Sequence, residues 1–246
     1  NLNLVDGAAL RFSGEIKDYQ PAVFTRYEGV EVMSLGGCIY ANKAKNIAVT
    51  GQGRLIGPGK SSAVHKQVRS DTIDDYIDWD SPVSERVYDG VNSEYIFPPM
   101  FISPIQCEGV YIEGISLENT AFWNIVPIYC DNVIVRGVTI HSVGIPRGDG
   151  INMDSTKNAL IEYCTFDNVK INSTKLFRAQ DLVDSRFSDI EVTTDDSTIS
   201  VLDAKNLLFE NIDFNVSGKI NLDIEGPASE SIEFRSCTNI DDGVYP

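Results

Sequence analysis

The chain repeats a short pattern about every two dozen residues, and this repeat limits the fold more than any other feature. Most copies start with a small or polar residue and continue with alternating apolar positions, a polar pair and two more apolar positions. An early copy starts at residue 46, and the later copies start at residues 109, 132, 158, 181, 206 and 231, in steps of 23 to 26 residues. A unit this small cannot bury an apolar face alone, whereas stacked units bury a continuous core.

The pattern within each unit is typical of short strands. Helical periodicity is hardly visible, whereas β-branched residues and asparagine are abundant. Each step also contains a second strand-like run, such as "WNIVPIYC" or "STISVLDA". Asn-Gly hairpin signals, which a sandwich of antiparallel strands would need, are scarce. We therefore predict an all-β protein, a single-stranded parallel β-helix that forms one domain over residues 1–246.

If the coils stack, two sets of residues have predictable places, one at a corner of the coils and one in the interior. Four asparagines occupy the same corner of their coils, where we expect a ladder of stacked amides with a structural role; they are Asn46, Asn132, Asn158 and Asn206. The apolar positions of the repeat should point inward; those that we expect inside are Val133, Ile140, Leu207, Phe209 and Ile212.

Charge excludes some classes of partner. The formal net charge is −16, and such a surface repels nucleic acid and anionic membranes, so we expect neither as a partner. The sequence contains no run of eighteen apolar residues, so we expect no membrane insertion. The acidity itself is typical of a surface that keeps a protein in solution, and we expect a monomer.

The five cysteines do not form a metal-binding pattern. They are scattered without a CxxC pair, and the spacing of a zinc site is missing. Their apolar neighbours favour small core residues, although a disulfide between Cys107 and Cys130 stays open. The sequence gives no signal for a metal or a cofactor, and we expect neither.

The segment from Lys60 to Pro99 interrupts the repeat. It is polar, charged and aromatic, and it separates the copy at residue 46 from the copy at residue 109. Long excursions of this kind are usually functional or flexible. Beside a groove, its aromatic rings would stack on sugars, and we expect Trp79 or Tyr95 to contact a bound sugar. The alternative is that the rings only hold the loop against the wall of the helix.

Several segments together resemble a known family. They include "VFTRYEGVEV", "PPMFISPIQCEGVYIEGISLENTAFWNIVPIYCDNVIVRGVTI" and "GDGINMDSTKNALIEYCTFD". From about Leu4 to Asp167 the chain is similar to the polygalacturonase-like glycoside hydrolases of family 28, especially the bacterial branch. The resemblance implies a right-handed parallel β-helix of the pectin lyase-like type and inverting hydrolysis of pectic glycosidic bonds. It also implies a secreted or periplasmic location, although the segment "NLNLVDGAALRF" shows no signal peptide.

The catalytic signature of that family is incomplete here. The family carries Asn-Thr-Asp, then Asp-Asp one coil later, then Gly-His-Gly and Arg-x-Lys. Arg147-Gly148-Asp149 occupies the first motif and keeps only its aspartate. Lys170 and Ile171 stand at the positions that we assign to the aspartate pair. Both histidines of the chain lie before that coil, and Arg-x-Lys is missing.

Asp195 and Asp196 are the best remaining acids, because they directly precede an alternating strand two coils beyond Asp149. Strands stack about 4.8 Å apart, so two coils separate backbones by roughly 9–10 Å. Inverting glycosidases hold acid and base about 6.5–9.5 Å apart. Candidate catalytic residues are therefore Asp149, Asp195 and Asp196, unless the last two are only turn residues. Candidate substrate-binding residues are Trp79, Tyr95, Arg147, Asp154 and Arg178.

These observations favour a glycoside hydrolase that acts on a pectic or related polysaccharide or oligosaccharide. A carbohydrate-binding β-helix that has lost catalysis is the alternative, because Asp149 alone cannot both donate and accept the protons. A self-assembling solenoid, the third class, would need matching exposed strands at both termini, and the sequence shows none. The missing Arg-x-Lys and the negative surface make a neutral or mixed pectic chain at least as good a substrate as galacturonan.

Overall fold

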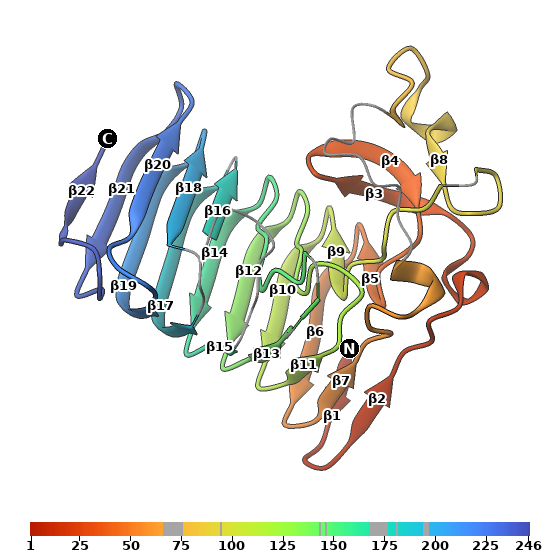
Figure 1. Ribbon diagram of the computed structural model, residues 1–246, viewed down its shortest axis with the longest axis horizontal. Coiled ribbons are helices and arrows are strands. Elements are labelled where there is room, and N and C mark those ends of the chain that lie inside the picture. The colour runs from red at the N-terminus through yellow and green to blue at the C-terminus, as the bar shows by residue number, and fades with distance from the viewer. Residues whose placement is uncertain are drawn as a thin grey trace.

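The computed structural model confirms the predicted parallel β-helix (Figure 1). It describes residues 1–65, 76–93, 95–142, 144–145, 147–167, 177–180, 182–193 and 197–246. In these ranges strands predominate. The helical elements there include short 3-10 turns at Ile16–Tyr19, Ala63–His65 and Val83–Glu85. No helix in this part of the chain is long and apolar enough to cross a membrane.

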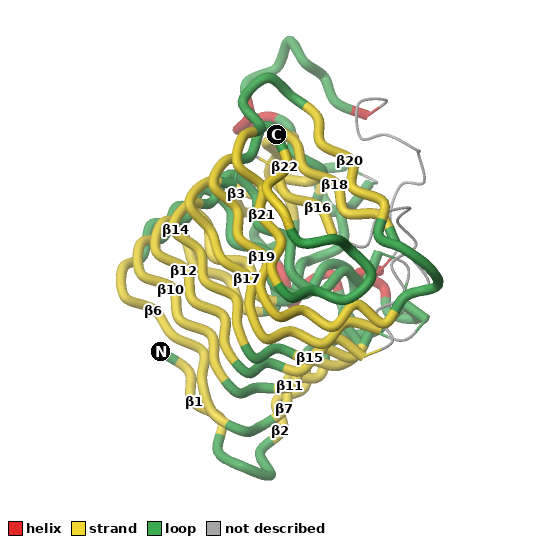
Figure 2. The backbone as a smooth tube through the Cα atoms, turned by 90° about the vertical axis from the view of Figure 1, so that its left-hand side faces the viewer, coloured by secondary structure: helices red, strands yellow, loops and turns green. Residues whose placement is uncertain are grey.

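Parallel strands form three walls, two of which face the viewer in Figure 2. The first wall contains β1 (Leu2–Leu4), β6 (Lys45–Gly51), β10 (Glu108–Glu113), β12 (Asp131–Arg136), β14 (Lys157–Glu162), β17 (Val183–Thr193), β19 (Lys205–Asn215) and β21 (Glu230–Arg235). The second contains β2 (Ala9–Arg11), β7 (Arg54–Ile56), β11 (Ser116–Glu118), β13 (Thr139–His141) and β15 (Thr165–Asp167), and the long strands β17 and β19 continue into it.

The third wall positions the candidate site. Its strands are β5 (Ile39–Asn42), β9 (Ile102–Ile105), β16 (Phe177–Gln180), β18 (Thr198–Leu202) and β20 (Asn221–Glu225). Between β9 and β16, single parallel bridges continue the wall through Ile125 and Ile128 and then through Ile151 and Asp154. At the C-terminal end, β22 (Gly243–Tyr245) pairs antiparallel with β21.

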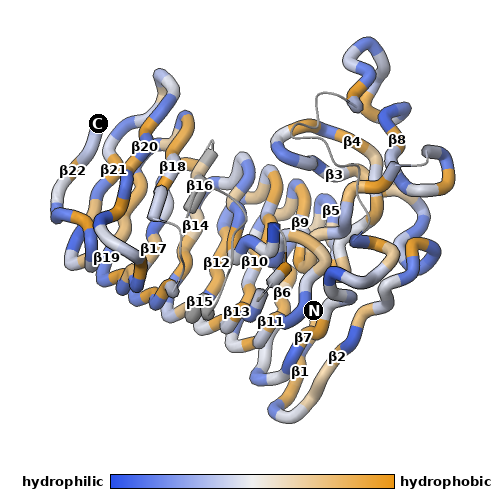
Figure 3. The backbone as a smooth tube through the Cα atoms, viewed as in Figure 1, coloured by the Kyte–Doolittle hydropathy of each residue, from blue (hydrophilic) through white to orange (hydrophobic). Residues whose placement is uncertain are grey.

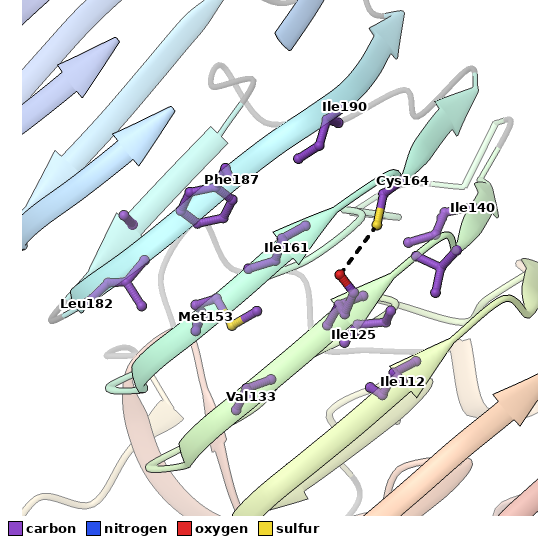
Figure 4. Packing of buried hydrophobic residues seen from close by; sticks show 14 of the residues in the cluster. Ile112, Ile125, Val133, Ile140, Met153, Ile161, Cys164, Leu182, Phe187 and Ile190 are labelled. Carbon is purple, nitrogen blue, oxygen red and sulfur yellow. Dashed lines mark hydrogen bonds between the residues drawn. The ribbon is translucent and has the colours of Figure 1, made fainter. Parts of the chain in front are cut away.

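The strands pair in register, so identical positions of successive coils form columns. Ile161 of β14 pairs with Phe187, which pairs with Phe209, which pairs with Phe234. The ring centroids of Phe187 and Phe209 lie 4.9 Å apart, and those of Phe209 and Phe234 lie 4.7 Å apart. Figure 4 shows Ile112, Ile161 and Phe187 within this interior, and orange and blue segments alternate along the coils in Figure 3.

The predicted interior and the predicted role of the cysteines are confirmed. The five apolar residues expected inside are at most 3% exposed. The cysteines are unbonded thiols, with three buried and two half-buried. The Sγ atom of Cys164, for example, donates to backbone carbonyls, including that of Val135 at 3.8 Å (Figure 4). They therefore act as small core residues.

The asparagine corner has a backbone explanation. The four asparagines have φ values of 54°, 65°, 54° and 54°, and the corner residues in register with them, including Gly109 and Asp184, are also left-handed. Asparagine and glycine tolerate this conformation better than other residues. The amide of Asn206 donates to Asp184 at 2.8 Å and that of Asn158 to Asp131 at 2.7 Å. The corner is thus a column of left-handed turns, in which these amides bond to carboxylates.

A separate three-stranded sheet stands beside the coils, at the upper right of Figure 1. It consists of the antiparallel hairpin β3 (Val23–Tyr27) and β4 (Val30–Ser34), with β8 (Val87–Tyr88) from the predicted excursion parallel to β4. Glu28 and Gly29 form its two-residue turn with φ values of 49° and 89°. Positive φ at both positions is typical of a tight type I′ hairpin. The sequence lacks the usual signal for this hairpin, because its turn is Glu-Gly instead of Asn-Gly.

We expect Phe209→Ala to lower the free energy of unfolding by about 3–5 kcal/mol, because it removes a buried ring from the middle of the phenylalanine column. Urea denaturation monitored by circular dichroism measures the change. Val5→Ala is the control, since Val5 is 68% exposed and its truncation should change stability by less than about 0.5 kcal/mol. Equal effects of the two changes would contradict the stacked core.

Candidate active site

Asp149 lies where the chain enters the third wall, two residues before Ile151. The backbone N–H of Asn124, one coil earlier, donates to the carbonyl of Asp149 at 2.9 Å. The Asn124 amide group also donates to this carbonyl at 2.9 Å and to Ser142 Oγ at 2.7 Å. Parallel pairing of Ile125 with Ile151 continues from this point. The backbone of Asp149 is therefore fixed by the coil before it.

The carboxyl group of Asp149 has few polar contacts. Its Oδ1 atom is buried and has no hydrogen-bond partner among the described residues. Its Oδ2 atom accepts a long hydrogen bond of 3.4 Å from the Asn152 amide. Burial raises the pKa of Asp149, whereas its hydrogen bonds and the charge of Arg147 lower it. The effect of burial is larger, and the pKa is about 6. Such a carboxyl group can hold a proton in mildly acidic solution and donate it.

Arg147 connects this coil to the hairpin. Its Nη1 atom donates to the Tyr27 hydroxyl at 2.9 Å and to Glu28 Oε1 at 2.8 Å. The charge of Arg147 lowers the pKa of Asp149, and the charge of Glu28 raises it. The hairpin therefore brings a second carboxylate to the surroundings of Asp149. Sequence reasoning missed Glu28, although "RYEGVE" gives a signal, a Glu-Gly turn between two β-type runs.

A second arginine fastens the hairpin to the wall. Arg26 Nη1 bonds to Asp154 Oδ1 and donates to Ser155 Oγ at 2.7 Å. The Arg26 guanidinium also lies 4.9 Å from the centroid of the Tyr129 ring. The Arg26 and Asp154 side chains are only 10% and 17% exposed, so removing one charge would leave the other buried without this partner. Asp154, a predicted substrate-binding residue, thus holds the hairpin, and its contact with substrate stays a prediction.

The two aromatic residues predicted to bind sugar retain exposed surface. Trp79 is 55% exposed, and the Arg86 guanidinium lies 5.4 Å from its ring centroid. Tyr95 is 38% exposed, and its ring meets that of Tyr76 edge-on at 5.4 Å. Each ring is thus held by a neighbour and keeps surface for a ligand.

Several predicted positions lie outside the described residues. These are Asp195 and Asp196, and also Lys170 and Ile171. The backbone of Arg178 belongs to β16 and pairs with Ser200 of β18. The side chain of Arg178 is not among those that the structure describes. Within the described ranges, no group of three histidine, cysteine, aspartate or glutamate side chains could hold a metal ion.

Comparisons with known proteins identify a fold. No family model and no curated protein matches the sequence. Among solved structures, an exopolygalacturonase from Thermotoga maritima has a TM-score of 0.66 and 22% identity, over 96% of this chain and 68% of that chain. A polygalacturonase from Erwinia carotovora has a TM-score of 0.58 and 16% identity, over 98% and 68%. A family 28 exopolygalacturonase from Yersinia enterocolitica has a TM-score of 0.51 and 15% identity, over 98% of this chain and 67% of that chain. The chain shares the fold of these enzymes.

The raised pKa of Asp149 predicts a specific pH dependence of stability. The folded protein keeps the Asp149 proton up to about pH 6, whereas the unfolded chain releases it near pH 3.8. The free energy of unfolding therefore falls as pH rises through this interval. Asp149→Asn removes this loss. Between pH 4 and pH 7 the free energy of unfolding of the variant should therefore rise by up to about 3 kcal/mol relative to that of the wild type, at about 1.36 kcal/mol per pKa unit.

Urea denaturation at both pH values measures this difference. Asp189→Asn is the matched control, since Asp189 is a corner aspartate that accepts a hydrogen bond from Asn211 at 2.6 Å. If Asp149→Asn and the wild type had parallel pH dependence, the carboxyl group would not hold its proton as described.

Proposed function

We propose that this protein is a polygalacturonase-like glycoside hydrolase with Asp149 as its general acid. The observation that carries the proposal is the Asp149 carboxyl group, with its buried oxygen that lacks a described partner and its pKa of about 6. A general acid works best when its pKa lies near the working pH, because it must be protonated and still donate readily. The fold shared with polygalacturonases also supports the proposal, as does the aspartate of the family's first motif, which Asp149 retains.

Inverting hydrolysis needs two carboxyl groups. Asp149 would protonate the glycosidic oxygen as the bond to the leaving sugar breaks, while a second, ionised group takes a proton from the attacking water. Our sequence prediction gives Asp195 and Asp196 as the best remaining acid and base, so one of them would take this second role. With that arrangement the product would have inverted configuration at the anomeric carbon.

The charges around Asp149 favour a neutral or mixed pectic chain. Arg26 and Arg147 lie near the coil of Asp149, and both are engaged with carboxylates of the protein, Asp154 and Glu28. An arginine that already has a carboxylate partner is a poor clamp for the carboxylate of a galacturonic acid unit. With the net charge of −16, this supports a substrate that carries few charges at the cleaved bond. We further propose that the protein acts as a secreted or periplasmic monomer.

A second candidate function is carbohydrate binding without catalysis. Its specific support is the exposure of Trp79 and Tyr95, because partly exposed rings can stack on sugars whether or not the bond is cleaved. Sugar binding without turnover on any pectic fragment would identify this function.

If the protein hydrolyses a glycosidic bond by this route, Asp149→Asn should lower kcat by at least about 10²–10⁴-fold, the usual contribution of a general acid. Release of reducing ends from a panel of neutral and charged pectic fragments measures the rate. Asp189→Asn again serves as the control and should retain the wild-type rate. Unchanged turnover by Asp149→Asn would exclude Asp149 as the acid.

We expect Trp79→Ala and Tyr95→Ala to weaken oligosaccharide binding by about 1–2 kcal/mol each, a factor of roughly 5–30 in Kd, because each removes an apolar stacking surface. Isothermal titration calorimetry with the fragment that the wild type binds best gives the affinities. Val91→Ala, a change at a 71% exposed residue of the same excursion, is the control. If neither aromatic change altered Kd, the excursion would only pack against the wall.

A further inference from the structure

We propose that Glu28, at the tip of the β3–β4 hairpin, is the second carboxylate of the site and acts as its general base. The inference rests on the proposed glycoside hydrolase function and replaces Asp195 and Asp196 in that role. It assigns catalysis to a residue outside the repeat, on an element that the coil pattern does not predict.

The hairpin tip is held firmly enough to place a catalytic group. The ring of Tyr27, next to Glu28, stacks between Phe97 and Phe122 with centroid distances of 4.3 Å and 5.0 Å. The buried Arg26 donates to the carbonyl of Gly29 at 2.6 Å, and bonds to Asp154 on the wall. Residues on both sides of Glu28 are thus fixed to the coils, as a preorganised site requires.

Arg147 brings Glu28 to the motif that carries Asp149. Glu28 Oε1 and Arg147 Nη1 are 2.8 Å apart, and Arg147 precedes Asp149 by two residues. The Glu28 side chain is 27% exposed, so water and substrate can reach it. Glu28 and Asp149 also interact electrostatically, since the charge of Glu28 raises the pKa of Asp149. The guanidinium that contacts Glu28 thus belongs to the residue two positions before Asp149, so the two carboxyl groups come from distant parts of the chain to one end of this motif.

The two carboxyl groups have different environments. Glu28 Oε1 lies 2.8 Å from the Arg147 guanidinium and its side chain is partly exposed, so a positive charge lies directly beside this carboxyl group. Burial favours the protonated form of Asp149, whose Oδ1 atom has no partner in the described part of the chain. An acid–base pair needs one neutral and one charged carboxyl group, and environments that separate the two pKa values provide them.

The turn itself is an unusual place for glutamate. Both turn residues have positive φ, which favours asparagine, aspartate or glycine at the first position. Asparagine would suit the backbone better but is too short to place a group where the Glu28 carboxylate meets Arg147. This gives a variant that removes the carboxylate while favouring the fold, Glu28→Asn.

The proposed step is balanced in atoms and protons. Water attacks the anomeric carbon as the carbon–oxygen bond to the leaving sugar breaks. Glu28 takes one proton from the water, and the Asp149 proton goes to the leaving oxygen. One water molecule is consumed, and exchange with solvent returns both carboxyl groups to their starting states. Arg147 acts as a positioning residue for Glu28.

The test compares Glu28→Gln and Glu28→Asn with the wild type on the pectic fragment that the wild type cleaves. Both variants should lose about 10²–10⁴-fold in kcat. They should also lose the acidic limb of the pH profile of kcat/KM, which reports the base. Sodium azide should restore turnover and form a glycosyl azide, because azide attacks without needing a base. Glu31→Gln is the matched control, since Glu31 lies in the same hairpin and accepts from the Tyr129 hydroxyl at 2.9 Å.

The outcomes separate this inference from the proposed function. An active wild type whose turnover survives both Glu28 changes but falls with Asp195→Asn or Asp196→Asn overturns the role of Glu28 alone. A fall in kcat with an unchanged acidic limb and no recovery in azide also overturns it, because Glu28 would then only position Arg147. A wild type without hydrolytic activity overturns the proposed function and the role of Glu28 together.

Discussion

Hydrogen bonding between successive coils places the strand residues of the described coils directly over their counterparts one coil earlier. The interior follows from it, because a phenylalanine or isoleucine over its own kind fills one continuous column. The left-handed corner follows as well, because a turn that one coil makes must be made by the next. The same constraint fixes the backbone of Asp149 through Asn124 and the pairing of Ile125 with Ile151. Packing, turn chemistry and the backbone position of Asp149 are therefore consequences of one register.

Much of the β-helix could be predicted from the sequence because these properties recur with the repeat. Three local features recur in most copies of the repeat. They are the alternation of apolar residues along the strands, the turn residues, and the apolar residues that point inward, such as Val133 and Phe209. The hairpin could not be predicted in the same way. It depends on contacts between residues far apart in the chain, among them Arg26 with Asp154, 128 positions later. A single Glu-Gly turn without a second copy gives no period to detect.

In the candidate site, too, the sequence motif predicts some features, whereas others depend on contacts between distant residues. Asp149 could be singled out from its motif, but its raised pKa depends on burial, which the motif does not contain. Arg147 was predicted to bind substrate, and its contacts with Tyr27 and Glu28 give it a role in joining two elements. Long-range pairs of this kind are visible only when the coil and the hairpin are seen together. They bring the carboxylate of Glu28 to Arg147, two residues before Asp149.

The central claim is that Asp149 keeps its proton in the folded protein and is coupled to Glu28. The most direct measurement is a carboxyl ¹³C NMR titration of Asp149 in the full chain, because it needs no substrate. The account predicts a midpoint of about 6, where burial dominates, and a lower midpoint in Glu28→Gln, where a raising charge has been removed. A midpoint near the ordinary value of 3.8, or one that Glu28→Gln leaves unchanged, would contradict it.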